Sequence, residues 1–91
     1  MATATLIARH QVDDYATWRS VYEDVEGLRQ EYGCTGKQVM TNPDDKQDVF
    51  ILHTFPTLEQ AQGFATSDAL REAMGRAGVQ GAPRIEIAVE A

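Results

Sequence analysis

Hydrophobic and polar residues alternate at several places along the chain, as they do in β-strands. In the segment 3–12 every second residue is apolar or His10, and the positions between are mainly polar. A period of two predicts a strand with one buried face. The segments 34–41 and 48–55 predict two more strands, and a fourth strand follows Pro83. Because the segment 48–55 is apolar on both sides, we expect both faces of that strand to be covered.

Two stretches have the period of three to four that is typical of amphipathic helices. The first follows an acidic pair at 13–14, which can cap free backbone amides, and ends at Gly33. The second begins with a capping box at 57–60, restarts at 67–68 and ends at Gly78. The apolar positions of the first helix are Tyr15, Trp18, Tyr22, Val25, Leu28 and Tyr32, and those of the second are Leu58, Ala61, Phe64, Ala65, Leu70, Ala73, Met74 and Ala77.

These elements follow the order β-α-β-β-α-β. With a turn at 42–46, a Gly/Pro loop at 78–83 and right-handed crossovers, the order predicts an α+β fold of ferredoxin-like topology. We expect a four-stranded antiparallel sheet with both helices on one side and the first and third strands in the centre. The apolar free face of the sheet should be covered by a second copy related by two-fold symmetry. The expectation is a single domain over residues 1–91 that forms a homodimer through sheet packing.

The charge of the chain narrows its possible partners. Fourteen acidic and eight basic residues give a net charge of −6, and the basic residues form no run. Nucleic acids and acidic membrane surfaces repel such a protein, so we expect neither as a partner. The one cysteine, Cys34, cannot form an internal disulfide, and there is neither a signal-peptide pattern nor a stretch that could span a bilayer. The expected location is the cytoplasm.

His10 is the first candidate for chemistry. It lies on the apolar parity of a strand that should be central. An imidazole in such a place needs a partner or a cavity, because burying an unpaired polar group is costly. As a general base, His10 could accept a proton from a phenol or from an activated carbon acid. The alternative is a core histidine hydrogen-bonded to a tyrosine or to the backbone.

Trp18 and Tyr22 lie one helical turn apart on the inner face of the first predicted helix. Their rings can form the wall of a pocket, and the indole N–H and phenol O–H can orient an oxygen of a ligand. The alternative is ordinary core packing, for which aromatic residues at this spacing are equally suited. We treat both residues as candidate substrate-binding residues.

Three further residues are candidates for the same apolar pocket. His53 should lie about 10 Å from His10, too far for a direct dyad, so it would bind substrate or have a structural or dimer-interface role. Phe64 and Met74 lie on the inner face of the second predicted helix. They would either pack in the core or form the floor of the cavity.

Neither a metal nor an organic cofactor is expected. Two histidines and one cysteine at unrelated spacings make no zinc motif. No glycine-rich turn leads from a strand into a helix, as it does in phosphate and dinucleotide sites. Cys34 follows the C-terminal end of a helix, whose dipole disfavours a thiolate, so we expect a structural thiol.

Three segments resemble a known family: Arg-His-Gln-Val-Asp-Asp-Tyr-Ala-Thr-Trp at 9–18, Asn-Pro-Asp-Asp at 42–45, and Leu-Arg-Glu-Ala-Met-Gly-Arg-Ala-Gly-Val at 70–79. They look like the small antibiotic biosynthesis monooxygenase-type (ABM-like) domains of the dimeric α+β barrel superfamily. The resemblance implies a ferredoxin-like protomer, a homodimer built by sheet packing, and a pocket between sheet and helices. Proteins of this kind include cofactor-independent oxygenases of aromatic polyketides, polyketide cyclases, haem-degrading enzymes and small-molecule isomerases.

Two of these activities lack their usual residues here. Haem-degrading relatives hold iron through a histidine on the second helix, and the segment 58–77 contains no histidine. The anthrone-type oxygenases typically place a tryptophan, a tyrosine and an asparagine around the pocket. The second helix of this chain offers Phe64 and none of those three. That mechanism therefore does not carry over residue by residue.

The resulting prediction is a cofactor-independent monooxygenase that acts on an aromatic or polyketide-like small molecule. His10 would be the general acid/base, while Trp18 and Tyr22 would position the ring. For oxygenation, the substrate carbanion itself would reduce O₂, so the protein need only deprotonate and desolvate it. A polyketide cyclase or isomerase could use the same base, and a non-catalytic ligand-binding dimer could use the same cavity. A dimer whose interior is filled by side chains is the structural alternative.

Overall fold

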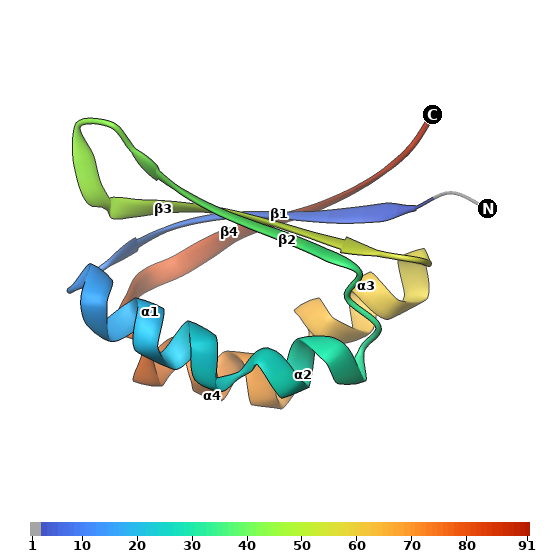
Figure 1. Ribbon diagram of the computed structural model, residues 1–91, viewed down its shortest axis with the longest axis horizontal. Helices are drawn as coiled ribbons and strands as arrows, with labels where there is room; N and C mark the ends of the chain where they lie inside the picture. Colours follow the sequence, from blue (N-terminus) through green and yellow to red (C-terminus); the bar gives the residue numbers. More distant parts are fainter. Residues whose placement is uncertain (1–2) are drawn as a thin grey trace.

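The computed structural model describes residues 3–91, apart from the side chain at position 82, so the first two residues of the expected domain lie outside it. The sheet has the strand order β2-β3-β1-β4 and is antiparallel throughout. The helices all lie on one face of this sheet (Figure 1). The predicted α+β fold of ferredoxin-like topology is confirmed, with the first and third strands in the centre. The elements are β1 (Ala4–Val12), α1 (Tyr15–Asp24), α2 (Glu26–Glu31), β2 (Gly36–Asn42), β3 (Asp45–Phe55), α3 (Leu58–Ala65), α4 (Asp68–Arg76) and β4 (Val79–Val89).

The core lies between the sheet and the helices. The even-numbered residues of β1 are all buried, as their alternation predicts. In β3 the odd-numbered residues from Val49 to Phe55 share that face, because Ala8 pairs with Ile51 and Leu6 pairs with His53. The helices contribute large aromatic side chains to the same cluster. This register decides which side chains of the two central strands face the helices.

Side chains at the helix starts explain where the helices begin. Asp14, Thr57 and Ser67 are N-caps, and each accepts a hydrogen bond from the backbone amide three residues later. The first predicted helix is wrong in one respect, because it is divided at Val25. This residue has φ −98° and ψ 18°, and α2 starts immediately after it. In α2 the side chain of Arg29 is buried, and Leu28 is only partly buried against the core.

The predicted loop at 78–83 is wrong, because β4 already begins at Val79. The pairing of β4 with β1 shifts register between Arg9 and Gln11, and Gly81 has a positive φ of 63°. Because β4 is an edge strand, a bulge can accommodate the extra residue there. Pro83 lacks a backbone N–H, and on an edge strand this removes no hydrogen bond from the centre of the sheet. The predicted turn at 42–46 is also shorter than expected, because β3 starts at Asp45.

Two apolar residues, one of them the predicted inner position Leu58, are exposed. Leu58, at the first position of α3, is 42% exposed, and Val89, at the end of β4, is 50% exposed. Both lie at the end of an element, where the neighbouring layer no longer covers the side chain. The remaining predicted inner positions of α3 and α4 are buried or half-buried.

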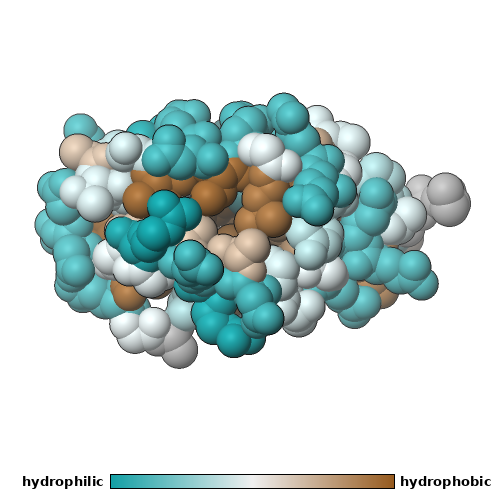
Figure 2. Space-filling view, turned by 90° about the horizontal axis from the view of Figure 1, so that it is seen from below, coloured by the Kyte–Doolittle hydropathy of each residue, from teal (hydrophilic) through white to brown (hydrophobic). Residues whose placement is uncertain are grey.

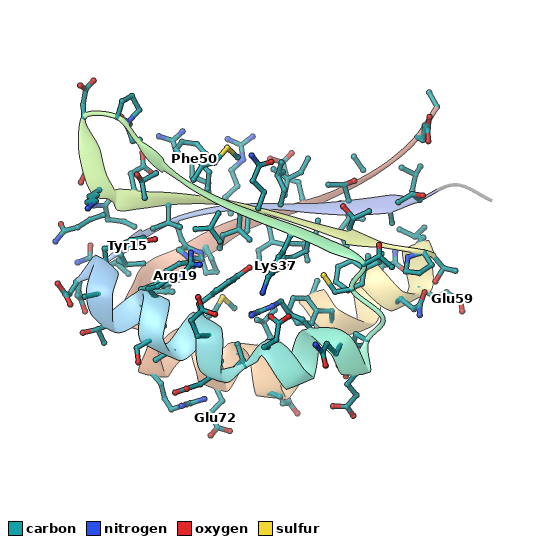
Figure 3. All side chains as sticks on the ribbon, in the orientation of Figure 1. Tyr15, Arg19, Lys37, Phe50, Glu59 and Glu72 are labelled. Atoms are coloured by element: carbon teal, nitrogen blue, oxygen red, sulfur yellow. The ribbon has the colours of Figure 1, made fainter. Side chains whose placement is uncertain are left out.

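The face of the sheet that points away from the helices, here called the free face, has an apolar centre. Ile7 of β1 pairs with Leu52 of β3, and Met40 of the edge strand β2 pairs with Phe50 of β3. Ile7 is 41% exposed and Met40 is 39% exposed, and Figure 3 shows Phe50 on this side of the sheet. At the edge of this apolar centre, Arg9 forms an ion pair with a carboxylate of β3 at 2.8 Å.

Candidate functional site

A pocket lies between the helix-covered face of the sheet and the helices. It has a volume of about 60 Å³ and a lining that is almost entirely apolar. Seen from the helix side, it opens as a hollow with hydrophobic walls surrounded by a hydrophilic rim (Figure 2). All the sequence-predicted site residues line it: His10, Trp18, Tyr22, His53, Phe64 and Met74. The strand register and the helical period together bring these six residues to one cavity.

His10 has no hydrogen-bond partner for either ring nitrogen among the described residues, although its side chain is buried. Its nearest aromatic neighbour is Trp18, at 5.8 Å between ring centroids. Burial lowers the pKa of His10 below its ordinary value of 6.5. The imidazole is therefore neutral at pH 7, with one nitrogen able to accept a proton and the other able to donate one.

His53 differs from His10, because it has a partner. The hydroxyl oxygen of Tyr22 lies 2.9 Å from Nε2 of His53 in the buried layer. Burial, followed by the nearby charge of Arg29, lowers the pKa of His53 to about 4, and burial raises the pKa of Tyr22. With a neutral imidazole and a protonated phenol, we assign the hydroxyl of Tyr22 as donor to Nε2 and place the ring proton on Nδ1.

The position of His53 excludes one of the roles proposed for it. His53 faces the helices, because it pairs with Leu6 of the buried parity, so a place at a sheet-to-sheet dimer interface is wrong. His10 pairs with Val49, four residues before His53 on the same strand. At about 3.3 Å per residue this spacing is roughly 13 Å, which confirms that the two histidines cannot form a direct dyad.

A row of rings connects the two histidines along one wall of the pocket. The centroids of Trp18 and Tyr22 are 5.0 Å apart in a stacked arrangement, and those of Tyr22 and His53 are 5.8 Å apart. Phe64 closes the row with an edge contact to His53 at 5.6 Å. Such a wall is flat and polarisable, which suits a planar aromatic guest.

Met74 is only half-buried, so it lies where the pocket wall meets solvent rather than at its floor. Leu70, one helical turn earlier on α4, also lines the pocket and is also half-buried. An unbranched methionine side chain changes rotamer at low cost. This side of the pocket can therefore widen at a small cost in packing.

Arg29 is a pocket residue that the sequence reasoning missed. Its side chain is 2% exposed, and its guanidinium carbon lies 3.9 Å from the centroid of the Tyr22 ring. Nη2 donates to the backbone oxygen of Tyr22 at 2.9 Å, and Nε and Nη2 both donate to Glu26. One feature of the sequence could have identified Arg29: it is a charged residue seven positions after Tyr22, on the apolar stripe of the helix.

Cys34 has the structural role expected for it, because its thiol donates to the backbone oxygen of Gly36 at 3.2 Å. Within residues 3–91, no group of three or more His, Cys, Asp or Glu side chains is placed to hold a metal ion. Among the helices of that part of the chain, none has both the length and the apolar character needed to cross a membrane.

Comparison with known proteins shows which fold this is. A protein from Bordetella bronchiseptica, provisionally named an antibiotic biosynthesis monooxygenase, superposes with a TM-score of 0.82 at 14% identity, covering 100% of this chain and 99% of its own. A conserved protein from Methanosarcina mazei Go1 gives 0.77 at 16% identity, covering 97% and 92%. SnoaB, a cofactor-independent oxygenase from Streptomyces nogalater, gives 0.75 at 10% identity, covering 100% and 93%.

No family model matches the sequence, and no curated protein matches it either. At identities this low, the structural likeness shows the fold alone. The chain therefore has the fold of the antibiotic biosynthesis monooxygenase-type proteins, as the three sequence segments predicted.

Proposed function

We propose that this protein is a cofactor-independent monooxygenase that acts on an aromatic or polyketide-like small molecule, with His10 as the general base. The observation that carries the proposal is the buried, neutral imidazole of His10, whose two nitrogens have no partner within residues 3–91. An unpaired imidazole costs stability unless something in the pocket uses it. A substrate whose acidic hydrogen points at His10 would supply that use.

The chemistry follows from removing one proton in an apolar cavity. His10 takes a proton from an activated C–H group, and the electron pair of that bond spreads over the aromatic substrate. This carbanion transfers one electron to O₂, and the two radicals combine to form a C–O bond. The resulting peroxide anion takes back the proton held by His10. The O–O bond of this hydroperoxide then breaks as the second C–H proton leaves, so one oxygen atom becomes a carbonyl and the other becomes water. The apolar lining favours these steps by excluding water from the carbanion.

Trp18 and Tyr22 would hold the ring of the substrate during these steps. Their stacked rings form the flat wall beside His10, and His53 orients Tyr22 through its hydrogen bond. The hydroxyl of Tyr22 is occupied by that bond, so the contribution of Tyr22 to binding would come from its ring face.

The homodimer expected from the sequence is part of this proposal. The apolar centre of the free face, with Ile7 and Met40 about 40% exposed, supports it. Sheet packing on that face would leave the helix-side opening of the pocket accessible, because the two features lie on opposite sides of the protomer (Figures 1 and 2). Each protomer would then keep its own site.

The small volume of the pocket favours a second candidate function, a structural one. About 60 Å³ is room for roughly four to six water molecules, well below the roughly 300–1,000 Å³ of typical small-molecule sites. Substrate would therefore have to displace the half-buried residues Leu70 and Met74 on entry. A protein whose interior stays closed by its own side chains is the alternative that this volume supports.

Oxygen uptake with an anthrone, a carbon acid activated by a carbonyl and two aromatic rings, tests the proposed activity. We expect one O₂ consumed per molecule converted, and a rate roughly 10²- to 10⁴-fold lower for His10→Gln than for the unmodified protein. Arg71→Gln on the outer surface of α4 is the control and should keep the full rate. Conversion without O₂ consumption would replace oxygenation with isomerisation, and an unchanged rate in His10→Gln would remove His10 from the mechanism.

A further inference from the structure

We propose that Arg29 binds an acidic oxygen of the ligand, so that the pocket selects aromatic molecules carrying a carboxylate, enolate or phenolate at the end away from His10. This inference rests on the proposed function, because it requires that the pocket receive a small molecule. It adds a specificity-determining residue and the charge of the group that this residue recognises.

Arg29 lines the pocket and has N–H donors that no described protein group uses. Nε and Nη2 carry three of its five N–H groups, and these serve Glu26 and the backbone oxygen of Tyr22. Nη1 makes no hydrogen bond with the described residues, and it is not one of the fully buried polar atoms that lack a partner, so the small exposed part of this side chain includes Nη1. Two N–H donors on a buried cation bind a carboxylate or an oxyanion more strongly than they bind a neutral oxygen.

The charges around Arg29 leave the site positive. Glu26 is shared between Arg29 and Lys37, whose Nζ lies 2.8 Å from the same carboxylate oxygen. Two cations and one carboxylate give these three side chains a net charge of +1. Lys37 points from β2 towards the helices (Figure 3). No acidic side chain of the described residues lines the apolar pocket, whereas Glu26 and Lys37 border, together with Arg29, a second pocket.

The location of Arg29 places this charge at a defined end of the cavity. The guanidinium group stacks on Tyr22, which is hydrogen-bonded to His53. His53 lies four residues along β3 from the partner of His10, which is roughly 13 Å. Nδ1 of His53, the second unpartnered donor in our assignment, belongs to the same end. The pocket thus has a base at one end and a cationic donor group at the other, joined by the aromatic wall.

Arg29 also has an alternative role as a brace of α2, through its contacts with Glu26 and the backbone oxygen of Tyr22. A brace alone would not distinguish anionic from neutral guests. Benzoate and benzamide have the same shape and differ in charge, so their relative affinity separates the two roles. Both are small enough to require little widening of the pocket.

The test is a titration of the full-length protein with each probe, followed by NMR chemical shifts of the residues lining the pocket. We expect the unmodified protein to bind benzoate roughly tenfold or more tightly than benzamide. Arg29→Gln should abolish this preference without weakening benzamide. Glu26→Gln retains the cation, removes its counter-charge and should raise the preference further. The controls, Arg71→Gln and Glu72→Gln, make the same changes in net charge at exposed positions of α4 and should leave the preference unchanged.

The outcomes separate this inference from the proposed function. If benzamide binds in the pocket and benzoate shows no advantage, or if the advantage survives Arg29→Gln, Arg29 is a brace and the inference is overturned while the pocket remains. If neither probe shifts the pocket residues, both proposals fail. Should Arg29→Gln not fold, Glu26→Gln alone decides, and an unchanged preference in that variant overturns the inference.

Discussion

The hydroxyl of Tyr22 lies 2.9 Å from Nε2 of His53, and this one hydrogen bond makes the two histidines of the pocket chemically different. His53 has a defined tautomer and a fixed orientation. His10 has a ring with both nitrogens free of protein partners within residues 3–91. A base has to exchange its partner during turnover, so the residue without a protein partner is the better candidate for proton transfer.

Removing the hydroxyl of Tyr22 should destabilise the fold. In Tyr22→Phe the Nε2 atom of His53 loses its partner in a buried place, so we expect the free energy of unfolding to fall by about 1–3 kcal/mol. Urea denaturation measures the change. Tyr32→Phe is the control, because the hydroxyl of Tyr32 makes no hydrogen bond with the described residues, and it should change stability by less than about 0.5 kcal/mol. Equal effects of the two substitutions would mean that the bond between Tyr22 and His53 contributes nothing.

Stability should fall on acidification between pH 6.5 and 4. The pKa of His53 is about 4 in the fold and near 6.5 in the unfolded chain, so the unfolded state takes up the proton first. The contribution of His53 is complete above pH 6.5 and is lost as the pH falls towards 4. The loss amounts to roughly 2 kcal/mol at pH 5. His10, whose pKa burial also lowers, acts in the same direction.

Urea denaturation at pH 7 and pH 5 measures this loss, and His53→Gln is the variant that assigns it. Glutamine can still accept a hydrogen bond from Tyr22 but does not titrate. We expect the difference in unfolding free energy between the two pH values to shrink by about 2 kcal/mol in this variant. An undiminished difference would assign the pH dependence to other groups.

A charge on the free face should dissociate the proposed dimer. Ile7 is 41% exposed in the protomer, so Ile7→Lys places the charge at the proposed interface with little cost to the fold of the protomer. Light scattering during size exclusion should give the mass of two chains for the unmodified protein and of one chain for Ile7→Lys. Leu58→Lys is the matched control, since Leu58 is 42% exposed on α3 and lies away from that face; it should stay dimeric. A monomeric unmodified protein would contradict the expected assembly.

The period of hydrophobic residues predicted the elements and their buried faces, and the order of the elements with right-handed crossovers predicted the strand order. The period placed His10 on the buried parity of β1 and Trp18 and Tyr22 on the inner face of α1, because those positions depend only on local geometry. Local geometry could not predict the hydrogen-bond partner of Tyr22, which is His53. This pairing depends on the register between β1 and β3, which decides that His53 faces the helices instead of the free face.

Arg29 and the start of β4 show the limits of a pattern in a single sequence. An arginine on an apolar stripe is readily assigned to solvent, and its burial depends on Glu26 and on the ring of Tyr22 at 3.9 Å. The glycines and the proline between Gly78 and Pro83 indicated a loop. Pairing with the end of β1 overrode that local preference, with a register shift to accommodate the extra residue.

The central claim is that His10 is a neutral, unpartnered imidazole in a pocket that receives an aromatic guest. Nitrogen-15 NMR of the two imidazole rings, recorded across pH with and without 2-naphthol, tests it most directly. We predict that His10 titrates below pH 6.5 and that its ring nitrogens shift when 2-naphthol is added, while the Nε2 signal of His53 keeps the signature of its bond to Tyr22. A His10 that titrates at or above pH 6.5, or whose nitrogens do not respond to 2-naphthol at any concentration, would contradict the account.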